Sequence, residues 1–353
     1  MFQALVEHPL VLAVVVFSLL FDFLNGFHDA ANSIATVVVT RTLTPIQAVV
    51  LAGFANFVGY FAFSHAIAKM VSQGILVIDM LPGAEQRLAL LMAALIGAVA
   101  WNLFTWWMGL PTSSSHALIG GMVGAGLAAA GPSMVILGDI AAKDGKLAVA
   151  GVLPIFLFII VAPLLGMLAS SLFTIVIINL FRKSTPARSA SIFRKLQLVS
   201  ATWYSIGHGT NDAQKTMGVI MLALFSGGLA SSMEISGWVA FSCYLAIGLG
   251  TAFGGWRIVR TMGTRITKIR AMEGFCAESA AALVLMGTAH FGIPVSTTHV
   301  IAGSIMGVGA VEQAGKVRWV TARRIVWAWI ITLPATAACA AVSFFLLTAL
   351  HAV

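Results

Sequence analysis

The feature that most constrains this chain is a series of apolar runs, each about twenty residues long, that recurs along its whole length. A run of that length crosses the hydrocarbon core of a bilayer as a helix. Only 9% of the residues are charged, whereas about a quarter are charged in a water-soluble domain. The short alternating segments of a transmembrane β-barrel are absent from the sequence. We therefore predict an all-α integral membrane protein.

The apolar runs predict about ten to twelve membrane-spanning segments. Two of these segments contain polar motifs, and we expect the helix to be broken there. The ten clearest segments are 9–40 and 196–229, both interrupted, and 46–69, 88–108, 114–131, 147–181, 236–257, 273–291, 296–312 and 324–350.

The positive charges of the chain predict its orientation. Cytoplasmic loops of membrane proteins carry an excess of Lys and Arg. If the N-terminus is outside, 15 of the 20 Lys and Arg residues fall on the inner side. We therefore expect a multi-pass protein of the cell inner (plasma) membrane with both termini outside. The net charge of +8 is then explained by these loops, and no nucleic-acid partner is expected.

Two polar motifs occur twice, at the same offset of 183 residues. In the second motif, segment 111–116 corresponds to segment 294–299; each has a proline, then Ser and Thr residues, then a histidine. Two motifs that share one offset indicate an internal repeat. The residues shared by the two copies of the first motif are Gly26, Asp29 and Ala30, and Gly209, Asp212 and Ala213.

The repeat divides the chain into two halves with about five spans each. Because five is odd, the halves must have opposite topology. We predict a first inverted repeat at 1–181, a basic cytoplasmic linker at 182–195 and a second inverted repeat at 196–353. This plan is typical of secondary transporters, whose sites form near the membrane midplane at broken helices.

Asp29 and Asp212 are carboxylates within predicted spans, where a charge is costly. The neighbouring glycines favour a local opening of the helix, which exposes backbone oxygens. Such oxygens with a carboxylate suit Na⁺, and a neighbouring histidine, His28 or His208, could instead carry a proton. The alternative is that each aspartate only caps a half-helix. Asp22, one or two turns before Asp29, is a weaker candidate.

The Ser and Thr residues of the second motif follow a proline and precede a Gly-rich helix. A helix that begins there presents free N–H groups and hydroxyl donors to an anion. Two such helix starts from opposite sides could surround a tetrahedral oxyanion; the alternative is ordinary N-capping. The two runs are Ser113, Ser114 and Ser115, and Ser296, Thr297 and Thr298.

Two charged residues break the symmetry of the repeat. Lys215 stands at the position that corresponds to Asn32, and Glu278 at the position that corresponds to Leu95. We expect Lys215 either to replace one bound cation or to pair with Asp212; the alternative is a lysine that reaches toward the interface. Glu278 is a candidate proton or cation ligand, unless it only bonds a neighbouring helix.

With these motifs the chain resembles the phosphate inorganic transporter family, in its bacterial low-affinity permease branch. The resemblance covers both halves. It implies that the six Ser and Thr residues of the second motif bind inorganic phosphate. It also implies a symporter of inverted repeats, commonly a homodimer, with neither an enzymatic activity nor a cofactor. The implied coupling-ion and substrate centre contains Asp29, Asn32, Asp212 and Asn211.

The chain departs from the family signature at three positions. His28 and Lys215 stand where the signature has Asn, and Asn56 lies near where sodium-coupled animal members carry a glutamate. These differences favour proton-coupled import of phosphate, or of a neutral complex with a divalent metal. No residues are firmly assigned to a metal. The alternatives are a sodium-coupled phosphate symporter and a sulfate permease of the same family. An intramembrane hydrolase is disfavoured, because no Gly-x-Ser-x-Gly segment occurs.

Overall fold

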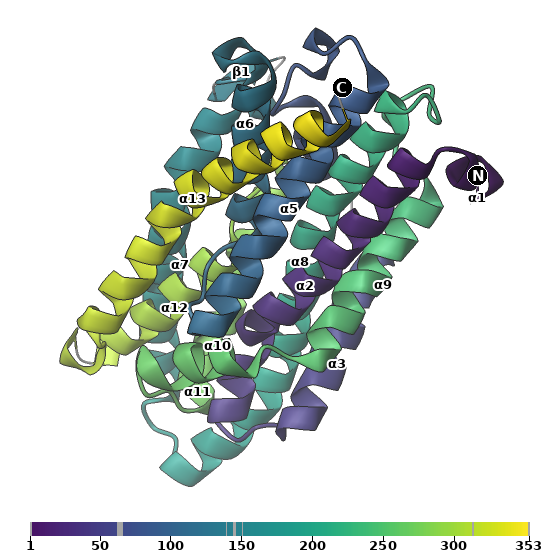
Figure 1. The fold of residues 1–353 in the computed structure, drawn as a ribbon. Helices are drawn as coiled ribbons and strands as arrows, with labels where there is room; N and C mark the ends of the chain where they lie inside the picture. The colour runs from purple at the N-terminus through teal and green to yellow at the C-terminus, as the bar shows by residue number, and fades with distance from the viewer. Residues whose placement is uncertain are drawn as a thin grey trace.

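Helices make up almost all of the computed structural model of the protein (Figure 1), which describes residues 2–351 except 62–65, 139, 144–145, 150 and 313. The predicted all-α fold is confirmed. The α-helices are α1 (Phe2–Glu7), α2 (Pro9–Val39), α3 (Pro45–Val58), α4 (Ala66–Gln73), α5 (Ala84–Met108), α6 (Ser114–Ala130), α7 (Val152–Phe181), α8 (Pro186–Ser226), α9 (Gly237–Phe253), α10 (Trp256–Arg260), α11 (Ala271–His290), α12 (Thr297–Glu312) and α13 (Trp319–His351).

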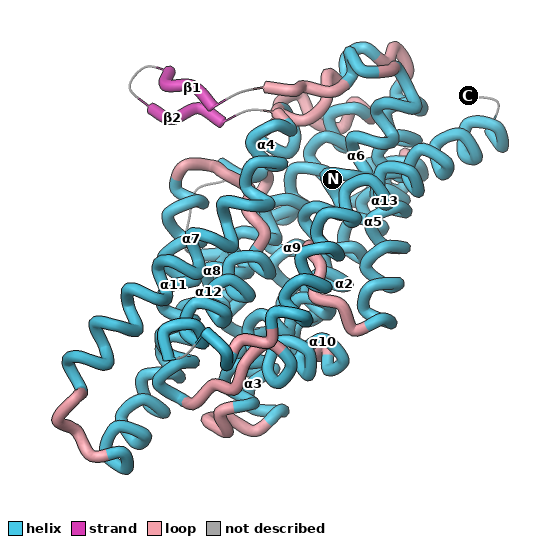
Figure 2. The backbone as a smooth tube through the Cα atoms, turned by 90° about the vertical axis from the view of Figure 1, so that its left-hand side faces the viewer, coloured by secondary structure: helices cyan, strands magenta, loops and turns pink. Residues whose placement is uncertain are grey.

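Shorter elements connect these helices. Strands β1 (Ile140–Lys143) and β2 (Lys146–Val149) form an antiparallel hairpin outside the helical bundle (Figure 2). The short helical turns are η1 (Gly59–Phe61), η2 (Ile78–Met80), η3 (Pro132–Met134), η4 (Thr261–Arg265) and η5 (Ala314–Lys316).

Within the described residues, four helices are long and apolar enough to cross a membrane, namely α2, α5, α7 and α13. The number rises to six if each of two bent helix pairs forms one span. One of these pairs joins α9 to the segment Trp256–Arg265 with a bend of 61°. The predicted ten to twelve segments also include the shorter apolar helices α6 and α12 and the more polar α8 and α11.

The predicted interruptions of segments 9–40 and 196–229 are wrong, because α2 and α8 run unbroken past both aspartates. The glycines of the two motifs have a different role. A Cβ atom at Gly26 would collide with the backbone carbonyl of Ile247 in α9, and one at Gly209 with the backbone of Asn56 in α3. The glycines therefore let neighbouring helices approach closely without opening their own helix.

The predicted linker 182–195 is mostly helical. Only residues 182–185 lie between α7 and α8, because α8 already begins at Pro186. The side chain of Thr185 caps this helix by accepting a hydrogen bond from the backbone N–H of Arg188, at 3.4 Å. Proline suits the first position of a helix, where its missing N–H has no partner to lose. Arg182 and Lys183 lie in the turn before α8, whereas Arg188, Arg194 and Lys195 lie on its first turns.

The two halves of the chain pack through corresponding helix pairs. Helix α2 packs against α9, and its counterpart α8 packs against α3. Likewise α6 packs against α13, and α12 against α7. Helix α2 starts at the end of the bundle that holds the N-terminus, whereas α8 starts at the opposite end (Figure 1).

The two chain ends and the β-hairpin lie at one end of the bundle (Figures 1 and 2). The turn from α7 to α8 lies at the other end, as do α10 and the start of α13. Six of the 15 predicted inner Lys and Arg residues lie in these segments, namely Arg182, Lys183, Arg257, Arg260, Arg323 and Arg324. The arrangement is thus compatible with the predicted orientation.

The contact between α6 and α13 depends on glycine. A Cβ atom at Gly124 would overlap the backbone carbonyl of Ala337. We expect Gly124→Ala to destabilise the protein by about 1–3 kcal/mol, the usual cost of overpacking. Gly287→Ala in α11 is the matched control, since no atom lies near its Cβ position. Denaturant unfolding measures both variants, and equal stability of the two would contradict the prediction.

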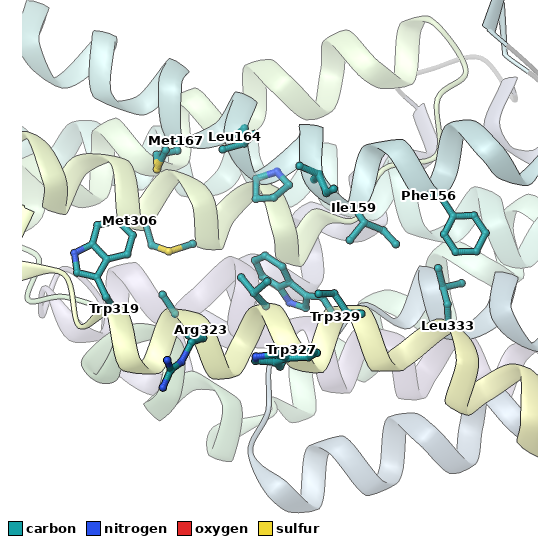
Figure 3. Close-up of a pocket in the computed structure, with 15 residues that line it drawn as sticks. Phe156, Ile159, Leu164, Met167, Met306, Trp319, Arg323, Trp327, Trp329 and Leu333 are labelled. Carbon is teal, nitrogen blue, oxygen red and sulfur yellow. The ribbon is translucent and has the colours of Figure 1, made fainter.

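An apolar groove of about 660 Å³ runs between α7 and α13 (Figure 3). Arg323 is the one charged residue among its lining residues. Trp327 of this groove is 57% exposed, as expected for an aromatic side chain that faces lipid. The groove therefore does not suit a multiply charged substrate, and the polar site lies elsewhere.

Candidate functional site

Helices α6 and α12 begin in the same way, with a serine cap. The Ser113 hydroxyl accepts a hydrogen bond from the His116 backbone N–H at 3.2 Å, and Ser296 accepts one from His299 at 3.3 Å. For these two serines, capping describes the observed geometry. The two residues that follow each cap point instead toward the duplicated aspartates.

Asp29 of α2 is buried among hydroxyl donors from both halves of the chain. Ser114 donates to its Oδ1 at 3.4 Å, and Thr298 donates to its Oδ2 at 3.3 Å. His28 Nδ1 lies 2.7 Å from Oδ1. Asn32, one helical turn further, donates to the Thr298 hydroxyl at 2.9 Å. The first copy of the motif thus joins a carboxylate, an imidazole and two hydroxyls.

Asp212 of α8 has the corresponding hydroxyl partners. Thr297 donates to its Oδ2 at 3.3 Å, and Ser115 donates to its Oδ1 at 3.4 Å. Lys215 Nζ lies 2.5 Å from Oδ1, and His208 Nε2 lies 3.4 Å from Oδ2. The second copy therefore has the same hydroxyl pattern and an additional ammonium.

The hydroxyl contacts connect the two halves in an exchanged pattern. Each aspartate takes one hydroxyl from its own half and one from the other half. A shift of 183 residues converts the contacts of Asp29 into those of Asp212. The starts of α6 and α12 therefore converge at one buried cluster, which we call the central cluster. It consists of Asp29, Asn32, Ser114, Ser115, Asp212, Lys215, Thr297 and Thr298.

The histidines extend the central cluster in two directions. His28 Nε2 lies 3.2 Å from the Thr105 hydroxyl of α5, and Thr112 donates to the same hydroxyl at 2.9 Å. His208 Nδ1 lies 3.2 Å from the side-chain oxygen of Asn56 in α3. Both imidazoles are buried. They can therefore exchange protons only along these polar contacts.

Among the residues that the structure describes, one group of His and Asp side chains could hold a cation. The ligand atoms of Asp29, His208 and Asp212 lie within 4.8 Å of one another. All three residues are buried, and Lys215 already contacts one oxygen of this group.

Glu278 lies away from the central cluster. Its carboxylate accepts hydrogen bonds from Ser200 at 2.5 Å and Gln197 at 3.1 Å. Ser200 precedes Asp212 by twelve residues, which places it ~18 Å away along α8 at 1.5 Å per residue. The Gln197 side-chain oxygen in turn accepts from Thr40 at the end of α2. Glu278 therefore belongs to a second polar group, nearer the end of the bundle where α8 begins.

Asn211, a predicted substrate ligand, points away from the central cluster. Its side-chain amide donates to the backbone carbonyls of Leu285 at 3.2 Å and Gly207 at 3.4 Å. It lines a separate cavity of about 160 Å³ together with Gln214. Adjacent residues on a helix point about 100° apart, and here that rotation turns the Asn211 amide toward α11 while Asp212 faces the central cluster.

The structure adds Tyr204 as a candidate and places Asp22, the weaker candidate from the sequence. Tyr204 donates to the Thr297 backbone carbonyl at 3.4 Å, a contact that no motif signals. Within the described residues, neither carboxylate oxygen of buried Asp22 has a hydrogen-bond partner. Seven residues separate Asp22 from Asp29, so both lie on one face of α2. The His116 and His299 rings meet with centroids 4.7 Å apart, and their ring nitrogens find no hydrogen-bond partner in the part of the chain that the structure describes.

The fold and the site define a class of protein: a polytopic membrane protein with buried charge and hydroxyl donors gathered between two helix starts. Within that class, the chain belongs to the Phosphate transporter family, whose family model matches residues 25–193 and 181–340. The family predicted from the duplicated motifs is thus confirmed.

Curated relatives agree over nearly the whole chain. A protein of Rhizobium meliloti called "Probable low-affinity inorganic phosphate transporter" is 48% identical, over 97% of this chain and 98% of its own length. A protein of Bacillus subtilis with the same name is 42% identical, over 96% of this chain and 97% of its own length. These relatives are transporters, in agreement with the prediction that the chain is not an enzyme.

A solved structure has the same fold. It is described as "The sodium-dependent phosphate transporter" and superposes with a TM-score of 0.80. It is 24% identical in sequence and covers 96% of this chain and 99% of its own.

Proposed function

We propose that this protein imports inorganic phosphate by symport with a cation, and that the cation is a proton rather than sodium. The observation that carries the proposal is the central cluster, in which four hydroxyl donors from two helix starts converge on two buried carboxylates. The names of the relatives support phosphate as the substrate.

The hydroxyls of the central cluster suit a tetrahedral oxyanion. Each of Ser114, Ser115, Thr297 and Thr298 donates to a carboxylate oxygen at 3.3–3.4 Å. Those distances are long for O–H···O bonds, which cluster near 2.7–2.8 Å. A phosphate ion between the helix starts could take over these weakly held donors, and the helix dipoles would favour its charge.

The shared donors also supply a reason for coupling. When the hydroxyls turn to phosphate, Asp29 and Asp212 lose their hydrogen-bond partners while they remain buried. A buried carboxylate without partners is strongly destabilised. Phosphate therefore binds well only together with a positive charge on each carboxylate. In this account, neither the anion nor the cation crosses alone.

A proton fits the first carboxylate better than sodium does. His28 lies 2.7 Å from Asp29 Oδ1, so an imidazolium can neutralise the carboxylate in place. Its other nitrogen continues to Thr105 at 3.2 Å, which gives the proton a polar path. Sodium coupling remains the alternative, and the solved structure of a sodium-dependent relative supports a coupling cation in general.

The cluster of Asp29, His208 and Asp212 favours one further candidate, import of phosphate with a divalent metal. Against it, such an ion would lie beside the Lys215 ammonium, which is 2.5 Å from Asp212. Two positive charges at that separation repel strongly in a buried site. We therefore favour a proton over a divalent metal as the transported cation. Whether uptake depends on divalent metal is one outcome of the test below.

Alternating access would follow from the two halves. We infer that the halves are inverted repeats with both termini outside. The opposite starting ends of α2 and α8 support this inference (Figure 1). Rocking of one half against the other would then open the central cluster to each side in turn. Glu278 and its partners would line the inner route for protons.

The test is uptake of radiolabelled phosphate into proteoliposomes, with pH and sodium gradients imposed separately. We expect an inward proton gradient to drive accumulation and a sodium gradient to add nothing. Sulfate in tenfold excess should not compete, and removal of divalent metals should not stop uptake. If neither gradient drives accumulation of phosphate, the protein is not a symporter. If sulfate competes with the labelled phosphate and unlabelled phosphate does not, phosphate is not the substrate.

The role of His28 gives a separate prediction. We expect His28→Asn to lower proton-driven accumulation by about tenfold or more, in line with typical contributions of positioned proton-transfer groups. Exchange of phosphate across the vesicle membrane at equal pH should fall less, because the hydroxyl donors are intact and Lys215 still neutralises Asp212. His290→Asn is the matched control, since His290 is exposed at the end of α11. An unchanged response to the pH gradient would exclude His28 as the proton carrier.

A further inference from the structure

Lys215 is a deeply buried charged group for which the coupling scheme has given no role. Its side chain is almost fully enclosed, with 1% exposure. The ammonium donates to Asp212 Oδ1 at 2.5 Å, to the Ser115 hydroxyl at 2.6 Å and to the Val295 backbone carbonyl at 3.1 Å. An ammonium has three N–H donors, so every donor of Lys215 is used inside the protein.

The three acceptors of Lys215 resemble the ligands of a cation site. A carboxylate, a hydroxyl and a backbone carbonyl are the oxygen ligands that hard cations take in proteins. They come from α8, from the start of α6 and from the residue before the cap of α12. The nitrogen of Lys215 thus stands where the two helix starts and Asp212 supply oxygens to one point.

The first copy of the motif is built without this charge. Asn32 occupies the corresponding position, three residues after Asp29, and donates to the Thr298 hydroxyl at 2.9 Å. The hydroxyl contacts of the two aspartates are otherwise the same. The first copy therefore forms the same hydroxyl contacts without an ammonium. If Lys215 only stabilised the fold, the difference between Asn32 and Lys215 would have no explanation.

We propose that the Lys215 ammonium is a permanent substitute for a transported cation at Asp212. The second copy of the site then binds no mobile cation. Only the His28–Asp29 pair of the first copy binds the cation that is transported with phosphate. The inference rests on the proposed function, since it assigns the ion site within that transporter. Each phosphate accordingly moves with one positive charge fewer than in a carrier with two mobile cation sites.

The direct test counts bound sodium on the purified full-length protein by equilibrium binding of ²²Na⁺. Lys215→Asn recreates the first-copy residue and exposes the oxygens of Asp212, Ser115 and Val295 to a mobile ion. We expect this variant to bind about one more Na⁺ per chain than the wild type. Sodium should also raise its thermal unfolding midpoint, by mass action. Lys69→Asn is the control, because it removes an equal charge from an exposed position on α4.

The outcomes separate the alternatives. A folded Lys215→Asn variant that binds no more Na⁺ than the wild type would overturn the proposal, whether or not its phosphate binding also falls. An extra Na⁺ in Lys69→Asn as well would overturn it too, because the site would then not be at Asp212. Failure of the wild type to accumulate phosphate would count against the proposed function, whereas the sodium count would still decide the role of Lys215.

A reciprocal variant keeps the idea testable if Lys215→Asn does not fold. Asn32→Lys places an ammonium three residues after Asp29. Lys215 has the same position relative to Asp212. We expect its proton-driven accumulation to fall by about 5- to 150-fold, the range of a lost coupling free energy. Accumulation equal to that of the wild type would contradict the proposal.

Discussion

Asp212→Asn is expected to lower the free energy of unfolding by about 3–5 kcal/mol, because it leaves the Lys215 ammonium buried without a carboxylate. The contact that is lost is the 2.5 Å pair between Lys215 and Asp212, in which both side chains are at most 2% exposed. Phosphate uptake should be abolished with it. Denaturant unfolding in detergent measures the stability, and radiolabelled uptake measures the function.

Two further variants identify the cause of this loss. Asp29→Asn removes the corresponding carboxylate, whose direct partners within the described residues are His28 and two hydroxyls and not an ammonium, so it should cost only the ~1–3 kcal/mol of a lost hydrogen-bonded partner. Asp212→Asn combined with Lys215→Asn removes both charges and should recover most of the stability of the wild type. If the two single aspartate variants were equally unstable, the buried ion pair would not be the reason.

Thr298→Val is expected to weaken phosphate binding by about 10- to 100-fold, which corresponds to the ~1.5–3 kcal/mol of a hydrogen bond to a charged group. The substitution keeps the shape of the side chain and removes only the hydroxyl. That hydroxyl donates to Asp29 at 3.3 Å and accepts from Asn32 at 2.9 Å. The apparent KM for phosphate uptake reports the change.

Thr348→Val is the matched control for this substitution. The Thr348 hydroxyl bonds a backbone carbonyl of its own helix, Phe344 O, at 3.0 Å and contacts nothing in the central cluster. Its loss should leave the KM unchanged. A Thr298→Val variant with the KM of the wild type would remove this hydroxyl from the substrate site.

The central cluster could be predicted largely from the sequence, because duplication supplies information that one motif lacks. A lone Ser-Ser-Ser run reads equally well as a helix cap, and Ser113 is one. Its repetition at Ser296, at the offset that also relates Asp29 to Asp212, indicated that hydroxyls and carboxylates share a site. The structure places Ser114, Ser115, Thr297 and Thr298 against the two carboxylates.

The unbroken helices could not be predicted in this way. A glycine beside a buried aspartate is compatible with an opened helix and with a close helix contact, and the choice depends on what lies across from it. Gly26 faces the backbone of Ile247, more than two hundred residues away in the chain. Such long-range contacts leave no local pattern.

The directions of individual side chains were also only partly predictable. Asn211 shares the motif of Asp212, yet the helical rotation of one residue turns it toward Leu285. Glu278 was predicted as a buried polar ligand, and its partners Ser200 and Gln197 place it at a separate group. Positions along a helix follow from the sequence, whereas partners depend on the packing of α8 against α11.

The most direct test of the central claim is to locate a bound oxyanion. Arsenate has the shape and charge of phosphate, and its anomalous scattering identifies it in a crystal of the protein. We predict a peak between the starts of α6 and α12, within hydrogen-bonding distance of Ser115 and Thr298. A peak found instead only in the basic surface cavity lined by Lys268 and Arg318 would contradict the account.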